Sequence, residues 1–168
     1  MPFNESVVTD EQPAISKQSI ERLADIILTL QRCFIARLSE TLSDGPVSFA
    51  QFFMLSHITA QDGLSMSEIA SRMNHTTAAA TGLVDRLEKF GYVERTTAAH
   101  DRRKVIVRIK PKGADLVAAI RQDMTESLTK VMLELDPDEQ SMWLQIYEKI
   151  FTYCQRNGAC PEAQDKLK

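Results

Sequence analysis

The sequence has few of the features that mark secreted or membrane-bound proteins. Its three cysteines, Cys33, Cys154 and Cys160, are an odd number that does not suit a disulfide framework. It has no run of about 18 apolar residues, which a transmembrane helix needs. The first residues lack the basic and apolar regions of a secretory signal. We therefore expect a cytoplasmic protein with reduced thiols.

The usual signatures of catalysis and metal binding are also missing. The three histidines, His57, His75 and His100, show none of the paired spacings that metal sites favour. Only six glycines occur, and there is no phosphate-binding glycine loop, no GxSxG motif and no HExxH motif. We expect no metal, no cofactor and no catalytic residue, so an enzyme is disfavoured.

Positive charge is scarce in the whole chain but concentrated in its middle. The formal net charge is −3. Between Ser65 and Gly113, however, ten Lys and Arg stand against five Asp and Glu, which makes this segment +5 and the flanks together −8. A basic segment in an acidic chain is typical of a protein that attracts phosphate with one face. An ordinary solvated surface is the alternative.

The first half of the chain shows the periodicity of two helices. The first is predicted from Lys17 to about Leu42, with Ser16 as its cap and a stop at residues 43–46. The second is predicted to run from a capping box at Ser48 and Gln51 to about Ala60. The apolar stripe of the first is Ile20, Leu23, Ile27, Leu30, Phe34 and Leu38, and the residues expected to face inward on the second are Phe49, Phe52, Phe53, Leu55 and Ile58.

Two shorter helices follow, joined by a polar turn. A second capping box, at Ser65 and Glu68, begins a helix whose Ile69, Ala70 and Met73 are expected to face a core. After residues 74–76 another helix is predicted from Thr77 to Phe90, ended by Gly91. Its expected buried residues are Leu83, Leu87 and Phe90. This is the outline of a helix-turn-helix.

The pattern then changes to that of a β-hairpin. Residues 92–96 and 105–109 predict two strands joined by a polar loop at 97–104. Only these two strands are expected, and a lone hairpin must lean on the neighbouring helices. A long helix then extends to about Leu135, with Val117, Ile120, Met124, Leu128 and Val131 on one side. A last helix, capped at Asp136, carries Trp143, Ile146, Tyr147, Ile150, Phe151 and Cys154 until residues 157–158.

The fold class expected is mainly α with a small β-hairpin wing. We predict a flexible arm at residues 1–15 and a frayed tail at 159–168. A winged helix-turn-helix is predicted at 47–113. The broad apolar stripes of 16–46 and 114–158 predict a helical dimerisation region, because a monomer would leave them uncovered.

The predicted DNA-binding residues lie on the helix-turn-helix and the hairpin tip. Short hydroxyl-bearing side chains at the start of the second of the two short helices suit a major groove, and arginines at a hairpin tip suit phosphate or a narrow minor groove. Asp101 is assigned to holding Arg103. The alternatives are an alanine run that packs internally and a solvated loop. The full set is Ser65, Ser67, His75, Thr76, Thr77, Thr81, Arg86, His100, Asp101, Arg102, Arg103 and Lys104.

Three groups of residues resemble the MarR family of winged-helix transcriptional regulators. They are Ser67-Glu68-Ile69-Ala70, the run from Thr81 to Arg95, and Asp101-Arg102-Arg103 with Gly113 downstream. The resemblance implies a homodimer that binds a pseudo-palindromic duplex DNA operator. Two departures stand out: many members have a basic residue at Gly82, and many have a capping Thr at Lys110.

The resemblance also implies a signal that releases DNA, and the most direct interpretation is a repressor released by a small aromatic or anionic effector. Phe49, Phe53 and His57 are candidates to line its pocket, with core packing as the alternative. A redox-sensing regulator acting through Cys33 is a second possibility, because some family members sense peroxides through a cysteine on the first helix. An inert buried thiol is the alternative at Cys33. A helical protein-interaction module without DNA binding is a third hypothesis.

Overall fold

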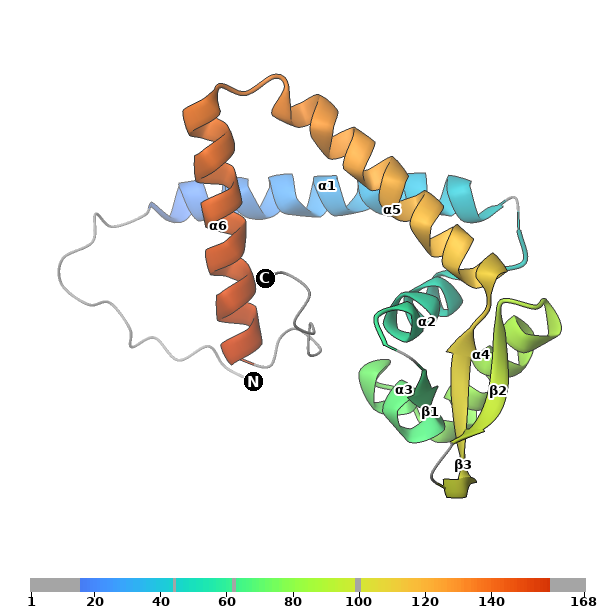
Figure 1. Cartoon of the computed structure of the whole chain (residues 1–168). Helices are drawn as coiled ribbons and strands as arrows, with labels where there is room; N and C mark the ends of the chain where they lie inside the picture. Colours follow the sequence, from blue (N-terminus) through green and yellow to red (C-terminus); the bar gives the residue numbers. More distant parts are fainter. Residues whose placement is uncertain (1–15, 44, 62, 99–100, 158–168) are drawn as a thin grey trace. The chain divides into compact units, whose positions relative to one another are not determined.

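The computed structural model describes residues 16–43, 45–61, 63–98 and 101–157, without the side chains of 98 and 101–103. Its contacts divide the chain into a first unit, Met1–Glu40, and a second unit, Thr41–Lys168. Most of α1 (Lys17–Ser43) belongs to the first unit (Figure 1). The second unit contains α2 (Phe49–Thr59), β1 (Leu64–Ser65), α3 (Met66–Arg72), α4 (Thr77–Lys89), β2 (Val93–Ala98), β3 (Asp101–Ile109), α5 (Pro111–Met132) and α6 (Pro137–Arg156). The predicted class, mainly helical with a small β-wing, is confirmed.

Capping chemistry in the sequence sets where the helices begin. Both predicted capping boxes form: Ser48 with Gln51 begins α2, and Ser65 with Glu68 begins α3. At α3 the Ser65 backbone N–H donates to Glu68 Oε2 at 2.8 Å, and the Ser65 hydroxyl donates to the same carboxylate. Asp136 caps α6 in the same way. Each box satisfies backbone N–H groups that a helix end leaves unpaired.

The sheet has one strand more than the sequence pattern predicts. Its order is β1-β3-β2, with both pairs antiparallel, and Leu64 of β1 lies opposite Val107 of β3. A strand of two residues is too short to show a period of two, so the prediction of only two strands is wrong. The predicted loop at 97–104 is too long. β2 extends to Ala98 and β3 begins at Asp101, and the pairing of the two strands has a register irregularity at Thr97/Ala98.

The core of the second unit lies between the sheet and helices α2, α3 and α4 (Figure 1). Its fully buried side chains include Met54, Leu55, Ile58, Leu64, Ile69, Val84, Leu87, Val93 and Val107. Gln51 is also buried, and its amide donates to the Leu83 carbonyl oxygen of α4 at 3.4 Å. Phe53 and Phe90, predicted to be buried, are instead 46% and 37% exposed. Because α2 contacts α3, α4, α5 and β3, its burial does not follow a single stripe.

A compact junction joins the end of α4, the start of β2 and the start of α5. Gly91 adopts a positive φ of 76°, and the Tyr92 N–H donates to the Leu87 carbonyl at 2.9 Å, which closes α4 in a Schellman motif. The Tyr92 carbonyl accepts from the Lys110 N–H at 2.9 Å. Gly113 packs so tightly here that an added Cβ would lie 2.4 Å from the Tyr92 carbonyl oxygen.

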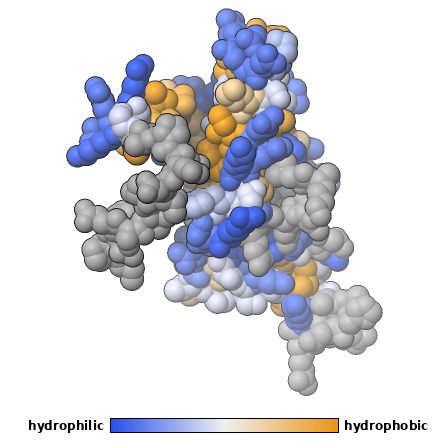
Figure 2. Space-filling model, turned by 90° about the vertical axis from the view of Figure 1, so that its left-hand side faces the viewer, coloured by the Kyte–Doolittle hydropathy of each residue, from blue (hydrophilic) through white to orange (hydrophobic). Residues whose placement is uncertain are grey.

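Three helices present apolar side chains at the surface of the single chain. Figure 2 shows hydrophobic residues exposed among hydrophilic ones on one face. Among the described helices, none has the length and apolar character required to cross a membrane. The exposed apolar residues include Ile20, Leu23, Ile27 and Leu30 of α1, Met124, Leu128 and Val131 of α5, and Met142, Ile146, Tyr147 and Ile150 of α6.

We predict that Gly113→Ala destabilises the protein by about 1–3 kcal/mol, because the new methyl group has no room beside the Tyr92 carbonyl. Urea unfolding of the purified variant measures the change. Gly82→Ala is the matched control: nothing lies within 4 Å of its added Cβ. That control gains up to about 1 kcal/mol from helix propensity. Equal effects of the two substitutions would contradict the packing of this junction.

We also predict a pH-dependent role for Glu68. Hydrogen bonds from the Ser65 side chain and backbone hold the pKa of Glu68 below its ordinary value of 4.5. A carboxyl whose pKa is lower in the folded state stabilises the fold above the unfolded pKa, and this contribution is lost as pH falls through the folded pKa. Glu68→Gln should therefore reduce the free energy of unfolding at pH 7, and its difference from the wild-type protein should shrink as pH falls below 4.5 through the folded-state pKa of Glu68. Denaturation across this pH range tests this, with Glu148→Gln on exposed α6 as the control.

Candidate nucleic-acid interface

The predicted helix-turn-helix is present as α3, a tight turn and α4. Asn74 takes the left-handed conformation, with φ of 51°, and the His75 N–H donates to the Ala70 carbonyl at 2.9 Å. The Thr76 hydroxyl accepts from the Ala79 N–H at 3.2 Å and caps α4. The polar turn in the sequence therefore ends one helix and begins the next within four residues.

The first two turns of α4 present a narrow outer surface. His75, Thr76, Thr77, Ala78 and Ala79 are all exposed. The same outer surface continues at Gly82, which is exposed and has nothing within 4 Å of an added Cβ. Since neither a turn nor a close contact requires glycine at position 82, the fold does not explain it. We name this surface, formed by residues 75–79 and 82, the α4 face.

Two predicted hydroxyl contacts have partners inside the protein. Ser65 is only 5% exposed, and its hydroxyl contacts the Glu68 carboxylate. The Thr81 hydroxyl donates to the Thr77 carbonyl at 2.8 Å. Ser67 is exposed, with its hydroxyl 3.1 Å from that of Ser65. The structure therefore places Ser65 in the capping box of α3 and away from the surface.

Exposed basic side chains lie on α4 and on β3. Arg86 and Lys89 are exposed on the last two turns of α4, and Lys104 is exposed on β3. The Ser65 hydrogen bonds are the main cause of the lowered pKa of Glu68; burial opposes them, and the charge of Lys104 makes a smaller contribution that lowers the pKa further. Lys104 therefore lies close enough to influence α3. Predicted residue His100 and the side chains of Asp101, Arg102 and Arg103 lie outside the described residues.

A brace between α4 and β2 was not predicted from the sequence. Arg95 of β2 places Nη2 2.6 Å from Asp85 Oδ1 and Nη1 2.5 Å from Glu88 Oε2. Its backbone N–H also donates to Glu88 Oε1 at 3.0 Å. Burial alone would lower the pKa of Arg95, but the hydrogen bonds to Asp85 and Glu88 outweigh burial and raise it. Residues seven and ten positions apart across a helix end follow no regular period, so sequence periodicity gives no signal for this contact.

The predicted effector residues lie on α2 in different environments. Phe49 is half-buried, Phe53 is exposed, and His57 is half-buried. Burial lowers the pKa of His57, and the charge of Arg72 lowers it further. A nearby cavity is lined by none of these three residues. Its walls are Thr41, Leu42, Gly45, Val47, Tyr92 and Leu116.

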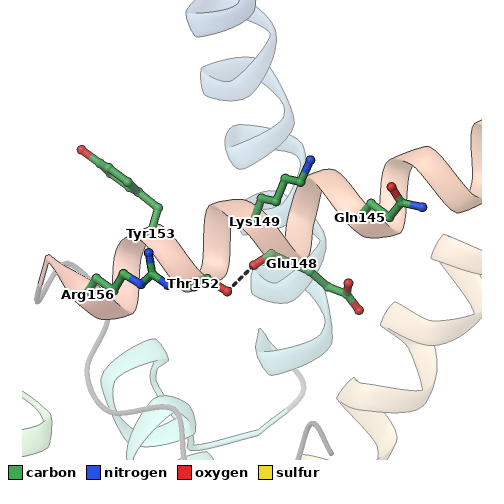
Figure 3. A pocket seen from close by; sticks show the side chains of 6 residues that line it. All are labelled: Gln145, Glu148, Lys149, Thr152, Tyr153 and Arg156. Atoms are coloured by element: carbon green, nitrogen blue, oxygen red, sulfur yellow. Dashed lines mark hydrogen bonds between the residues drawn. The ribbon is translucent and has the colours of Figure 1, made fainter. Parts of the chain in front are cut away.

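The remaining candidates show no converging chemistry. Cys33 is exposed on α1, whereas its place beside the apolar stripe favoured a buried thiol. Among the described residues, no three His, Cys, Asp or Glu side chains gather as metal ligands would. Figure 3 shows a depression on α6 whose six lining side chains all project from that one helix. There the Thr152 hydroxyl donates to the Glu148 carbonyl at 2.8 Å, within the helix.

Comparison with known proteins places this geometry in one family. Residues 46–104 match the model of the MarR family. The chain is 32% identical over 100 residues to the HTH-type transcriptional repressor MdtR of Bacillus subtilis, a match that covers 58% of this chain and 64% of MdtR. The chain spans about three fifths of the length of the first curated relatives that it matches.

Solved structures share the fold over a longer stretch. A MarR family protein from Bacillus stearothermophilus superposes with a TM-score of 0.75 at 21% identity, covering 84% of this chain and 99% of that one. S. aureus MepR is similar both in a mutant bound to an oligodeoxyribonucleotide (TM-score 0.60) and bound to ethidium bromide (TM-score 0.62), each at 20% identity. These two matches cover 78% and 77% of this chain and 96% and 94% of the MepR chains. The capped helix-turn-helix, the β-wing and the family match together identify residues 46–104 as similar to the MarR family of winged helix-turn-helix transcriptional regulators, and the solved structures share the fold of the longer stretch.

Proposed function

We propose that this protein regulates transcription in the cytoplasm by binding duplex DNA as a homodimer, with α4 in the major groove. The observation that carries the proposal is the α4 face, which is exposed, free of bulky side chains except His75, and begins at a capped helix N-terminus. Small residues permit close approach to base edges, and the positive end of the helix dipole favours phosphate. The MepR structure with an oligodeoxyribonucleotide supports this assignment.

The wing completes the proposed interface. Arg86 and Lys104 are exposed, and together with Arg102 and Arg103 they are the proposed phosphate contacts. Ser67, Thr76, Thr77 and His75 are proposed to contact the DNA from the two helices, with His100 and Asp101 at the hairpin tip. Thr81 supports the helix surface, and Ser65 contributes by holding the start of α3.

Dimerisation is proposed through α1, α5 and α6, in the regions 16–46 and 114–158. Each of these helices exposes several large apolar side chains. Soluble monomers seldom leave so many large apolar side chains of a helix exposed to water. A two-fold dimer presents two copies of the α4 face, so the proposed operator is pseudo-palindromic.

We further propose that the protein is a repressor released by a small aromatic or anionic effector. The cavity beside Tyr92 is a more suitable place for it than Phe49, Phe53 and His57, because Tyr92 belongs to the junction that joins α4 to α5. A ligand that moved Tyr92 would therefore move α4. The MepR structure with ethidium bromide supports a small aromatic ligand in this fold. The redox alternative depends on Cys33, and exposure alone does not make a thiol reactive.

Salt-dependent DNA binding tests the proposed interface. Fluorescence anisotropy with a labelled duplex from the region upstream of the gene measures the association constant K at several salt concentrations. For each phosphate contact, log K should fall by about 0.9 for every tenfold rise in salt concentration. Arg86→Ala combined with Lys104→Ala should weaken binding and make this slope shallower by about two contacts per subunit, or about four per dimer. Lys130→Ala, on exposed α5, is the matched control and should leave the slope unchanged. Failure of the wild-type protein to bind duplex DNA would favour the helical protein-interaction module instead.

A second prediction concerns close approach of the α4 face. Gly82→Leu adds a large side chain where the fold has open space, so the free energy of unfolding should not fall. DNA affinity should fall on the order of tenfold, because the new side chain separates the helix from the groove. Anisotropy and urea unfolding on the same preparation measure both quantities. Unchanged affinity would show that position 82 does not face DNA.

A further inference from the structure

The proposed DNA-binding helix carries two carboxylates near its basic residues. Asp85 and Glu88 lie on α4 on either side of Arg86, and their side chains are 58% and 37% exposed. Negative charge beside a phosphate backbone opposes binding by electrostatic repulsion. At 0.1 M salt this repulsion is screened only beyond a distance of about 10 Å. Left alone, this pair would offset much of the attraction that Arg86 and Lys89 provide.

Arg95 spans both carboxylates with one guanidinium group. Nη2 contacts Asp85 at 2.6 Å, Nη1 contacts Glu88 at 2.5 Å, and the Arg95 side chain is 26% exposed. A planar fork with donors on both arms can hold two carboxylates at once, which a lysine ammonium does less well. The cluster of Arg95, Asp85 and Glu88 therefore has a net charge of −1 instead of −2.

The brace also connects the wing to the helix. Arg95 lies opposite Val107 in the ladder between β2 and β3, within the paired part of the hairpin. Its backbone N–H donates to the other oxygen of the Glu88 carboxylate, so main chain and side chain of one residue hold the same partner. Movement of the hairpin relative to α4 would break three contacts together.

We infer that Arg95 is a positioning residue that neutralises Asp85 and Glu88 toward the DNA phosphates while it holds the wing against α4. This inference rests on the proposed DNA binding. Arg95 would then affect the affinity for DNA although its guanidinium group contacts Asp85 and Glu88 of the protein. The residue acts through local charge and through the angle of the hairpin.

Replacing one member of the cluster separates charge from structure. Asp85→Asn removes one negative charge and leaves Arg95 its contacts with Glu88. DNA affinity should rise about two- to threefold at about 50 mM salt and return toward the wild-type value at about 200 mM, because salt screens the removed repulsion. A purely structural brace predicts the opposite sign, since the substitution weakens it. An affinity that is unchanged or lower overturns the inference.

Replacing Arg95 provides the complementary measurement. Arg95→Gln should lower affinity on the order of tenfold at about 50 mM salt and less at about 200 mM. Adding Asp85→Asn to this variant should restore part of the loss, although it removes a further polar contact. Arg95→Lys keeps the charge but not the fork, so its affinity should fall with the salt slope unchanged. Losses that do not depend on salt, with no recovery in the double variant, would overturn the charge-neutralising role.

The same anisotropy titrations distinguish this inference from the proposed function. All variants are compared with the wild-type protein on the labelled upstream duplex, and thermal unfolding confirms that each is folded. Wild-type protein that does not bind the duplex contradicts DNA binding itself. Wild-type protein that binds with a normal salt slope, while Asp85→Asn and Arg95→Gln bind equally well, contradicts only the role of Arg95.

Discussion

The backbone junction at Tyr92 is the constraint on which the second unit of the structure depends. Its N–H closes α4 through the Leu87 carbonyl, and its carbonyl accepts the Lys110 N–H just before α5. The Lys112 ammonium lies 4.4 Å from the centre of the Tyr92 ring and donates to the Phe90 carbonyl at 3.0 Å. Gly113 allows the start of α5 to lie directly against this peptide. Since these contacts join short segments with little freedom, α4, the base of the wing and the start of α5 must keep a common orientation.

This junction gives the proposed regulator a route from its helices to DNA. In a fold where α4 ended freely, a ligand near α5 would have little effect on the α4 face. Here the cavity beside Tyr92 has walls from the end of α1, the segment before α2 and α5. A small displacement in it acts on a closely packed set of atoms, and packed interiors transmit strain because they contain few voids. The proposed effector site and the proposed DNA surface are therefore mechanically connected.

The charge distribution shows why local position matters more than total charge. The chain is acidic overall, and even its basic middle segment contains five acidic residues. Several of them make specific contacts within the protein: Glu68 takes part in the capping box of α3, and Asp85 and Glu88 form ion pairs with Arg95. One of the basic residues counted in favour of phosphate binding, Arg95, thus contacts carboxylates. Arg86, Lys89 and Lys104 remain exposed, and Arg86 and Lys104 are among the proposed phosphate contacts, together with Arg102 and Arg103.

The residues alone were enough to predict the six helices of the described part of the chain, the capping residues that begin α2, α3 and α6, and the helix-turn-helix with its hairpin. These features depend on spacing and on hydrogen bonds between residues two to four positions apart, so they are visible in a short stretch of chain. Tertiary structure alone decided that β1 pairs with β3, that Phe53 and Phe90 are exposed, that Ser65 is buried, and that Arg95 bridges two carboxylates of α4. Each of these depends on which distant segment lies alongside, and no local period encodes that choice.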